Sequence, residues 1–145
     1  MTTDELEALL AEGVVVRVRA DRDEARKELD AAKTHLLGAE DAAHRDPTGA
    51  FSLAYDAARK AVVAHMRANG LRVLPRFGAH YQTGRYARAA LAGGRVADED
   101  LSAFANMRVV RNDTEYEAEV VELSDAAEAL AHAAKIVAAV EAELE

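Results

Sequence analysis

Apolar residues recur along the chain at intervals of three and four rather than two, which is the spacing of one face of an α-helix. The pattern predicts helices throughout and no strands. The last predicted helix runs towards residue 144 after a cap at Ser124 or Asp125. Its stripe comprises Leu123, Ala127, Leu130, Ala134, Val137 and Leu144. A first long helix ends between Gly38 and His44, and its stripe comprises Val18, Ala25, Leu29, Ala32 and Leu36.

Turn and capping residues divide the rest of the chain. Asp46-Pro47 predicts the start of a second long helix and Asn69-Gly70 its end. Its buried face is expected to comprise Phe51, Tyr55, Ala58, Val62 and Met66. Residues 71–79 contain Pro75 and Gly78 and predict a loop. A third helix is expected over residues 80–91, before Gly93-Gly94. A fourth opens at Asp98-Glu99-Asp100, where carboxylates complement the helix dipole.

A short additional helix is predicted at the N-terminus, where Thr2 and Glu5 form a capping box before Leu6. The whole pattern favours an all-α fold, an up-and-down four-helix bundle with this short extra helix, in one domain over residues 1–145. A length of 145 residues and an apolar fraction of 50% suit one such core.

Composition narrows the chemistry. The chain has no cysteine, which excludes disulfides, thiolate metal sites and cysteine nucleophiles. Its five histidines are scattered, and we expect neither a metal site nor a cofactor. We read the apolar runs as too short to span a membrane, so we expect a soluble, cytoplasmic protein with no membrane partner.

Charge is unevenly distributed along the sequence. The net charge is −8, yet eight of the 18 basic residues fall within residues 59–95, where no Asp or Glu occurs. Such a basic stretch in an acidic chain favours a polyanionic partner. Aromatic residues interleave with its arginines, a combination suited to stacking bases and neutralising phosphates. The interleaved residues are Arg72, Arg76, Phe77, Tyr81, Arg85, Tyr86 and Arg88.

Residues 108–116 hold a second cluster, with Arg111 followed by Asn112 and, five residues after the Arg, Tyr116. Together with residues 51–61 and His80, this pattern resembles the HEPN superfamily of small prokaryotic helical domains. The resemblance covers roughly residues 15–145. It implies a homodimer in which two motif helices face each other and form a metal-independent ribonuclease site.

The resemblance also implies residue roles. Arg111 matches the family's motif Arg and Asn112 its polar follower, while Tyr116 stands where the family has a catalytic His. The implied function is the RNA-acting toxin of a toxin–antitoxin or defence system, with a nucleotidyltransferase-type antitoxin as a partner. Catalysis is expected at Arg111, Asn112 and Tyr116. Nucleotide or RNA binding is expected at Arg59, Arg76, His80, Tyr81, Arg85, Arg88 and Arg108.

Other interpretations stay open. Tyrosine, with an ordinary pKa near 10, replaces an imidazole poorly at neutral pH, so enzymatic activity is left undecided. One alternative is a non-catalytic nucleotide- or RNA-binding module, and another is a structural protein-interaction domain. In the last case Arg111 would pair with Glu115 one helical turn away, and Phe77 and Tyr86 would pack under the loop of residues 71–79.

Overall fold

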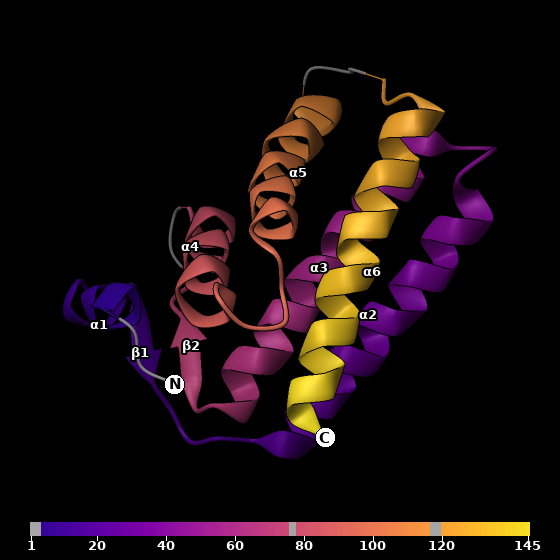
Figure 1. Cartoon of the computed structure of the whole chain (residues 1–145). Coiled ribbons are helices and arrows are strands. Elements are labelled where there is room, and N and C mark those ends of the chain that lie inside the picture. The colour runs from indigo at the N-terminus through magenta and orange to yellow at the C-terminus, as the bar shows by residue number, and fades with distance from the viewer. Residues whose placement is uncertain (1–3, 76–77, 117–119) are drawn as a thin grey trace.

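The computed structural model describes residues 4–75, 78–116 and 120–145, without the side chains of residues 113–116. It is predominantly helical, as expected, and contains one small sheet. The elements in chain order are α1 (Asp4–Ala11), β1 (Val15–Arg17), α2 (Arg22–Ala42), α3 (Pro47–Ala68), β2 (Leu71–Val73), α4 (Ala79–Leu91), α5 (Asp98–Tyr116) and α6 (Leu123–Leu144) (Figure 1).

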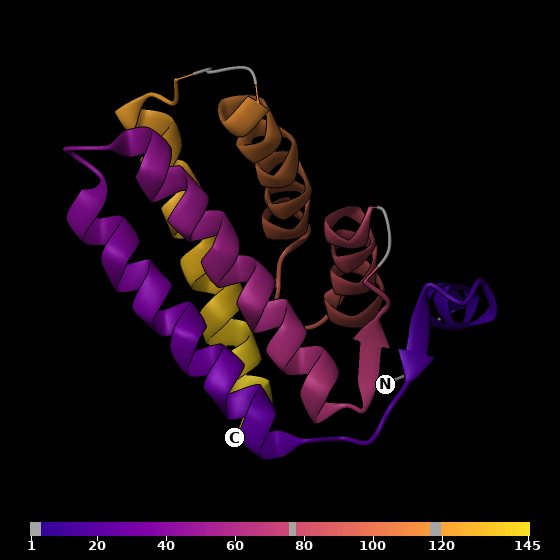
Figure 2. The ribbon, with the colours of Figure 1, turned by 180° about the vertical axis from the view of Figure 1, so that it is seen from behind.

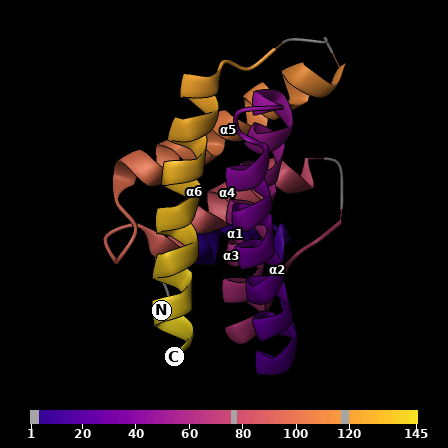
Figure 3. The same cartoon turned by 90° about the vertical axis from the view of Figure 1, so that its right-hand side faces the viewer.

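Helix α3 is the centre of the arrangement, since it contacts α2, α4, α5, α6 and β2. Helices α2 and α3 run side by side along their length (Figure 2). Seen at right angles, α2 and α6 lie in front, with α4 and α1 behind them (Figure 3). The buried face of α3 is rich in alanine, including Ala54, Ala57 and Ala61, and such small side chains allow neighbouring helices to approach closely.

The start of α3 follows the prediction. Asp46 caps the helix by accepting a hydrogen bond from the Gly49 N–H at 2.9 Å, and Pro47 occupies the first turn. The five residues of the predicted face are all buried. The predicted starts of α4 and α5 are also confirmed to within one residue.

The expectation of no strands was wrong. β1 and β2 pair antiparallel, with Val15 opposite Val73, so the first part of the predicted 71–79 loop is a strand. Each strand is three residues long, too short for an alternating pattern to be visible in the sequence. Gly70 leads into β2 with φ +68°, a left-handed conformation that glycine adopts without strain.

Two predicted stripes need correction. Val18 does not belong to α2, because the N-cap of that helix is Asp21. The N–H of Val18 instead donates a hydrogen bond to the Gly70 carbonyl at 2.9 Å. In α6, Leu123, Ala127 and Ala134 are exposed, and neither Ser124 nor Asp125 is the N-cap, which is Glu122. The buried face of α6 comprises Ala126, Ala129, Ala133, Ile136, Val137, Ala139, Val140 and Leu144. So many alanines make two rotations of the helix look equally apolar in the sequence.

Candidate functional site

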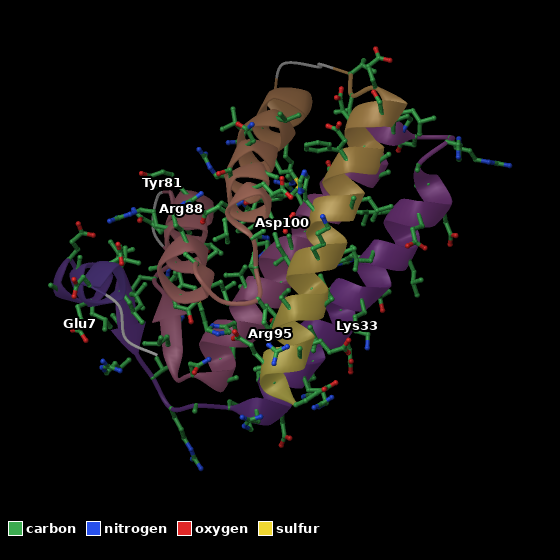
Figure 4. The ribbon with its side chains drawn as sticks, in the orientation of Figure 1. Glu7, Lys33, Tyr81, Arg88, Arg95 and Asp100 are labelled. Carbon is green, nitrogen blue, oxygen red and sulfur yellow. The ribbon has the colours of Figure 1, made fainter. Side chains whose placement is uncertain are left out.

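A cavity of about 210 Å³ lies between α3, α4 and α5. Each helix contributes aromatic or charged side chains to the walls of this cavity. Tyr55 comes from α3, His80 and Tyr81 come from α4, and Phe104 and Arg108 come from α5. Figure 4 shows Tyr81 and Arg88 on α4, at the side of the molecule away from α6. The cavity therefore joins the predicted basic segment to the predicted motif helix.

Aromatic rings form the inner wall of this cavity. The ring of Tyr55 stacks on Phe104 at 5.5 Å between centroids and lies 5.9 Å from the ring of His80. Two guanidinium groups cover aromatic faces: Arg111 Cζ lies 5.7 Å from the Tyr55 centroid, and Arg108 Cζ lies 5.5 Å from the Tyr81 centroid. Such cation–π contacts fix arginines at an aromatic surface.

Among the side chains that the structure describes, positive charge exceeds negative charge around Tyr55. The carboxylate of Asp56 lies 3.6 Å from Arg59 Nε and 3.9 Å from Arg111 Nε, so two guanidinium groups share it. Asp56, Arg59 and Arg111 are all partly buried, which weakens solvent screening of their charges. With Arg108 close by, the described side chains of this cluster comprise three cations and the carboxylate of Asp56. Such a group of guanidinium side chains favours an added anion.

The hydroxyl of Tyr55 is buried and makes no hydrogen bond within the part of the chain that the structure describes. Burial raises the pKa of Tyr55 to about 12, although Arg59, Arg111 and Arg108 act in the opposite direction. The hydroxyl is therefore protonated at neutral pH. An unsatisfied buried hydroxyl is costly, which makes it a good partner for a ligand oxygen.

His80 lies at the entrance to this cluster, in the first turn of α4. Partial burial lowers the pKa of its imidazole, and the charges of Arg59 and Arg111 lower it further. The positive end of α4 adds to this field, because the first N–H groups of a helix have no partner within the helix. His80 is thus a neutral imidazole at pH 7 in a cationic environment.

Two arginines that line the cavity have carboxylate partners at the surface. Arg85 Nη1 lies 3.1 Å from Glu12 Oε2, just after α1, and Arg88 Nη1 lies 3.7 Å from Asp98 Oδ1 at the start of α5. Their role in binding a polyanion stays a prediction. Tyr86 is buried, as the structural interpretation expected, and cannot stack on a base.

Of the predicted residues, five line the cavity, namely His80, Tyr81, Arg85, Arg88 and Arg108. Arg59 and Arg111 lie next to its Tyr55 wall, on either side of Asp56. Asn112 is exposed and does not line the cavity. Arg76, Phe77 and the side chains of Glu115 and Tyr116 lie outside the described residues, so neither the Arg111–Glu115 pair nor the role of Tyr116 is addressed. Among the described side chains, Arg111 Nε lies 3.9 Å from Asp56 Oδ1 of α3.

Three residues of this region were not predicted from the sequence to belong to the site. Tyr55 and Phe104 line the cavity, and Asp56 lies between Arg59 and Arg111. The buried position of Tyr55 was correctly expected, but nothing in the sequence indicates an unpartnered hydroxyl. One signal was available: Phe104, Arg108 and Arg111 are spaced by four and three residues, so they share one face of α5.

Two further histidines lie in polar contacts elsewhere. His65 Nδ1 lies 2.8 Å from the Tyr86 hydroxyl and Nε2 lies 2.9 Å from Glu143, which ties α3 to α4 and α6. His132 Nδ1 lies 2.7 Å from the buried Asp100, which is labelled between α5 and α6 in Figure 4. Among the described residues, no three His, Asp or Glu side chains form a group that could hold a metal ion.

When the chain is compared with known proteins, no family model, curated protein or solved structure matches it. The resemblance to the HEPN superfamily therefore stays a prediction. None of the described helices combines the length and apolarity needed to cross a bilayer.

Proposed function

We propose that this protein binds the phosphate of a nucleotide or an RNA at the cavity between α3, α4 and α5. One observation carries the proposal: Arg108 and Arg111 lie over the rings of Tyr81 and Tyr55 at the walls of this cavity. Arg59 lies beside them, on the other side of the Asp56 carboxylate from Arg111. Guanidinium groups suit phosphate oxygens because their N–H donors match the geometry of those oxygens.

The cavity also suits a nucleobase. The ring of Tyr81 is about half exposed beside it, and the imidazole of His80 is exposed as well. Bases stack on such rings without requiring a particular sequence. The buried hydroxyl of Tyr55 would donate to an oxygen of the ligand, which satisfies an atom that otherwise has no described partner.

The family resemblance supports the RNA part of the proposal, because Arg111, its matched motif Arg, belongs to the cluster. The same proposal includes four further predictions: a HEPN-like four-helix bundle, a homodimer, a nucleotidyltransferase-type antitoxin and a cytoplasmic location. Of the implied catalytic trio, Arg111 contacts the ring of Tyr55, which lines the cavity, whereas Asn112 is exposed and does not line it.

Metal-independent RNA cleavage is a second candidate, favoured by the neutral imidazole of His80 among the arginines. In such a reaction the imidazole would take the proton from a ribose 2′-hydroxyl, and the 2′ oxygen would form a bond to phosphorus. The bond from phosphorus to the 5′ oxygen would break, and the proton would pass to that leaving oxygen. His80 would then supply the imidazole that the motif in α5 lacks.

Isothermal titration calorimetry at low salt tests the binding proposal. Wild type should bind AMP more tightly than adenosine, since only AMP carries the phosphate. Arg108→Gln should weaken AMP binding about tenfold or more, the effect of losing a charge-assisted hydrogen bond. Arg45→Gln, an exposed arginine in the turn between α2 and α3, is the matched control and should change nothing. Equal affinity for AMP and adenosine would contradict the proposal.

Cleavage is tested with total RNA in EDTA. The second candidate requires that wild type degrades RNA and that His80→Asn and Arg111→Ala each abolish degradation, while Arg45→Gln retains it. RNA that stays intact with wild type removes the nuclease interpretation and leaves the binding proposal standing.

A further inference from the structure

A second cavity, of about 530 Å³, lies on the other side of His80, between α3, β2 and the start of α4. Its polar lining is mainly basic, with Arg59, Arg67 and Arg72 against the single carboxylate of Glu28. His80 lines this cavity as well as the first one. The two cavities therefore have His80 as a common wall. Arg59, which lines the second cavity, lies 3.6 Å from the Asp56 carboxylate that also faces Arg111.

Among the described residues, fewer arginines of the second cavity than of the first form an ion pair with a carboxylate. Within the described part of the chain, no carboxylate forms an ion pair with Arg67 or Arg72. Glu28 lies 3.9 Å from Lys60 Nζ, so the one acidic group already has a cationic partner. A second anion is therefore favoured here, independently of the first.

We infer that the site takes a single-stranded polynucleotide, with one nucleotide in each cavity and the linking phosphodiester beside His80 and Arg59. The inference rests on the proposed function and deepens it, because it replaces a mononucleotide with a chain of at least two nucleotides. Cations spaced over two adjoining cavities match a ligand whose charges repeat along a backbone.

The surroundings favour a polynucleotide over an acidic peptide or a duplex. Aromatic rings surround the first cavity, whereas an acidic peptide has no need of a stacking surface. The apolar lining of the second cavity, formed by Val63, Met66 and Leu71, accepts the face of an unpaired base. Bases of a duplex are stacked on each other and cannot enter separate cavities.

Fluorescence titration with labelled oligoadenylate of about eight nucleotides tests the inference, in ribose and deoxyribose forms, with AMP as the short reference ligand. Wild type should bind at least one oligonucleotide about tenfold or more tighter than AMP. The double variant Arg67→Ala with Arg72→Ala should lose that advantage and keep its affinity for AMP. The slope of log affinity against log salt should become shallower by about 0.7 for each phosphate that the variant no longer neutralises. Arg45→Ala is the control.

The outcomes separate the two claims. If AMP binds but the double variant keeps the full affinity for the oligonucleotide, or loses AMP affinity equally, the two-cavity inference is overturned and the proposed function stands. Displacement by polyglutamate as effective as displacement by the oligonucleotide, or equal binding of duplex, also overturns it. If neither AMP nor an oligonucleotide binds wild type, both claims fail. Circular dichroism verifies that the variants are folded.

Discussion

Two buried tyrosines on neighbouring helices differ in how their hydroxyl groups are satisfied. The hydroxyl of Tyr86 bonds to His65 Nδ1 at 2.8 Å, whereas the hydroxyl of Tyr55 has no partner among the described residues. A buried polar atom without a partner costs stability, and such atoms are kept where a ligand uses them. The contrast supports the proposed ligand role of Tyr55 and indicates a structural role for Tyr86.

Removing each hydroxyl should therefore have opposite effects. Tyr55→Phe should raise the free energy of unfolding by about 1 kcal/mol, because an unsatisfied group is removed, while AMP binding weakens. Tyr86→Phe should lower the free energy of unfolding by about 1–2 kcal/mol, because His65 loses a partner. Urea denaturation measures both. A destabilised Tyr55→Phe with unchanged AMP affinity would contradict the ligand role of the hydroxyl.

His65 predicts a dependence of stability on pH. Burial lowers the pKa of this imidazole, more strongly than the neighbouring Glu143 raises it, and Tyr86 is its other polar neighbour. The folded state thus favours neutral His65, and its contribution is complete above the ordinary pKa of about 6.5. As pH falls below that value the unfolded chain takes up the proton first, so stability decreases until the pH passes below the folded pKa.

Urea denaturation between about pH 7.5 and pH 5 checks this expectation. The lowered pKa of His80 also makes stability decrease as pH falls. The measurement is therefore made in the His80→Asn variant, which leaves the contribution of His65. Stability that rises as pH falls through this range would be inconsistent with a buried, neutral His65.

At the scale of elements, the turn from α3 into β2 depends on Gly70. A Cβ at this position would lie 2.8 Å from the Val18 carbonyl oxygen, and φ is +68°. Gly70→Ala should therefore destabilise the protein by about 1–3 kcal/mol. Gly84, inside α4, is the matched control, because a Cβ there meets nothing within 4 Å.

Gly84→Ala should stabilise the protein by about 0.5–1 kcal/mol through helix propensity alone. Thermal and urea unfolding of the two variants give the comparison. Equal effects of the two substitutions would show that the Gly70 turn does not constrain the fold.

Helix boundaries were predictable where a single residue sets them. Asp46 with Pro47, and Asn69 with Gly70, act locally and gave the two ends of α3. The strands were not predictable, because their pairing joins residues 15–17 to residues 71–73 across the chain. The rotation of α6 was not predictable either, because alanine on every side carries little information about which face is buried.

At the scale of the whole molecule, the site depends on contacts that no local pattern reveals. The sequence identified the basic stretch and Arg111 separately, and the packing of α5 against α3 joins them through Asp56. Packing also pairs Arg85 with Glu12 and Arg88 with Asp98, so these two arginines have carboxylate partners on other elements. Tertiary structure therefore decides which positive charges are left to bind a ligand.

The central claim is that a phosphate binds among Arg59, Arg108 and Arg111 beside His80. The most direct measurement is an NMR titration of the histidine side chains, with and without AMP. If a phosphate binds there, AMP should shift the His80 resonances and raise the pKa of His80, since a bound anion stabilises the imidazolium. His35 and His44, on and just after α2, should be unaffected. If the signals and the pKa of His80 do not change at saturating AMP, phosphate does not bind among these arginines.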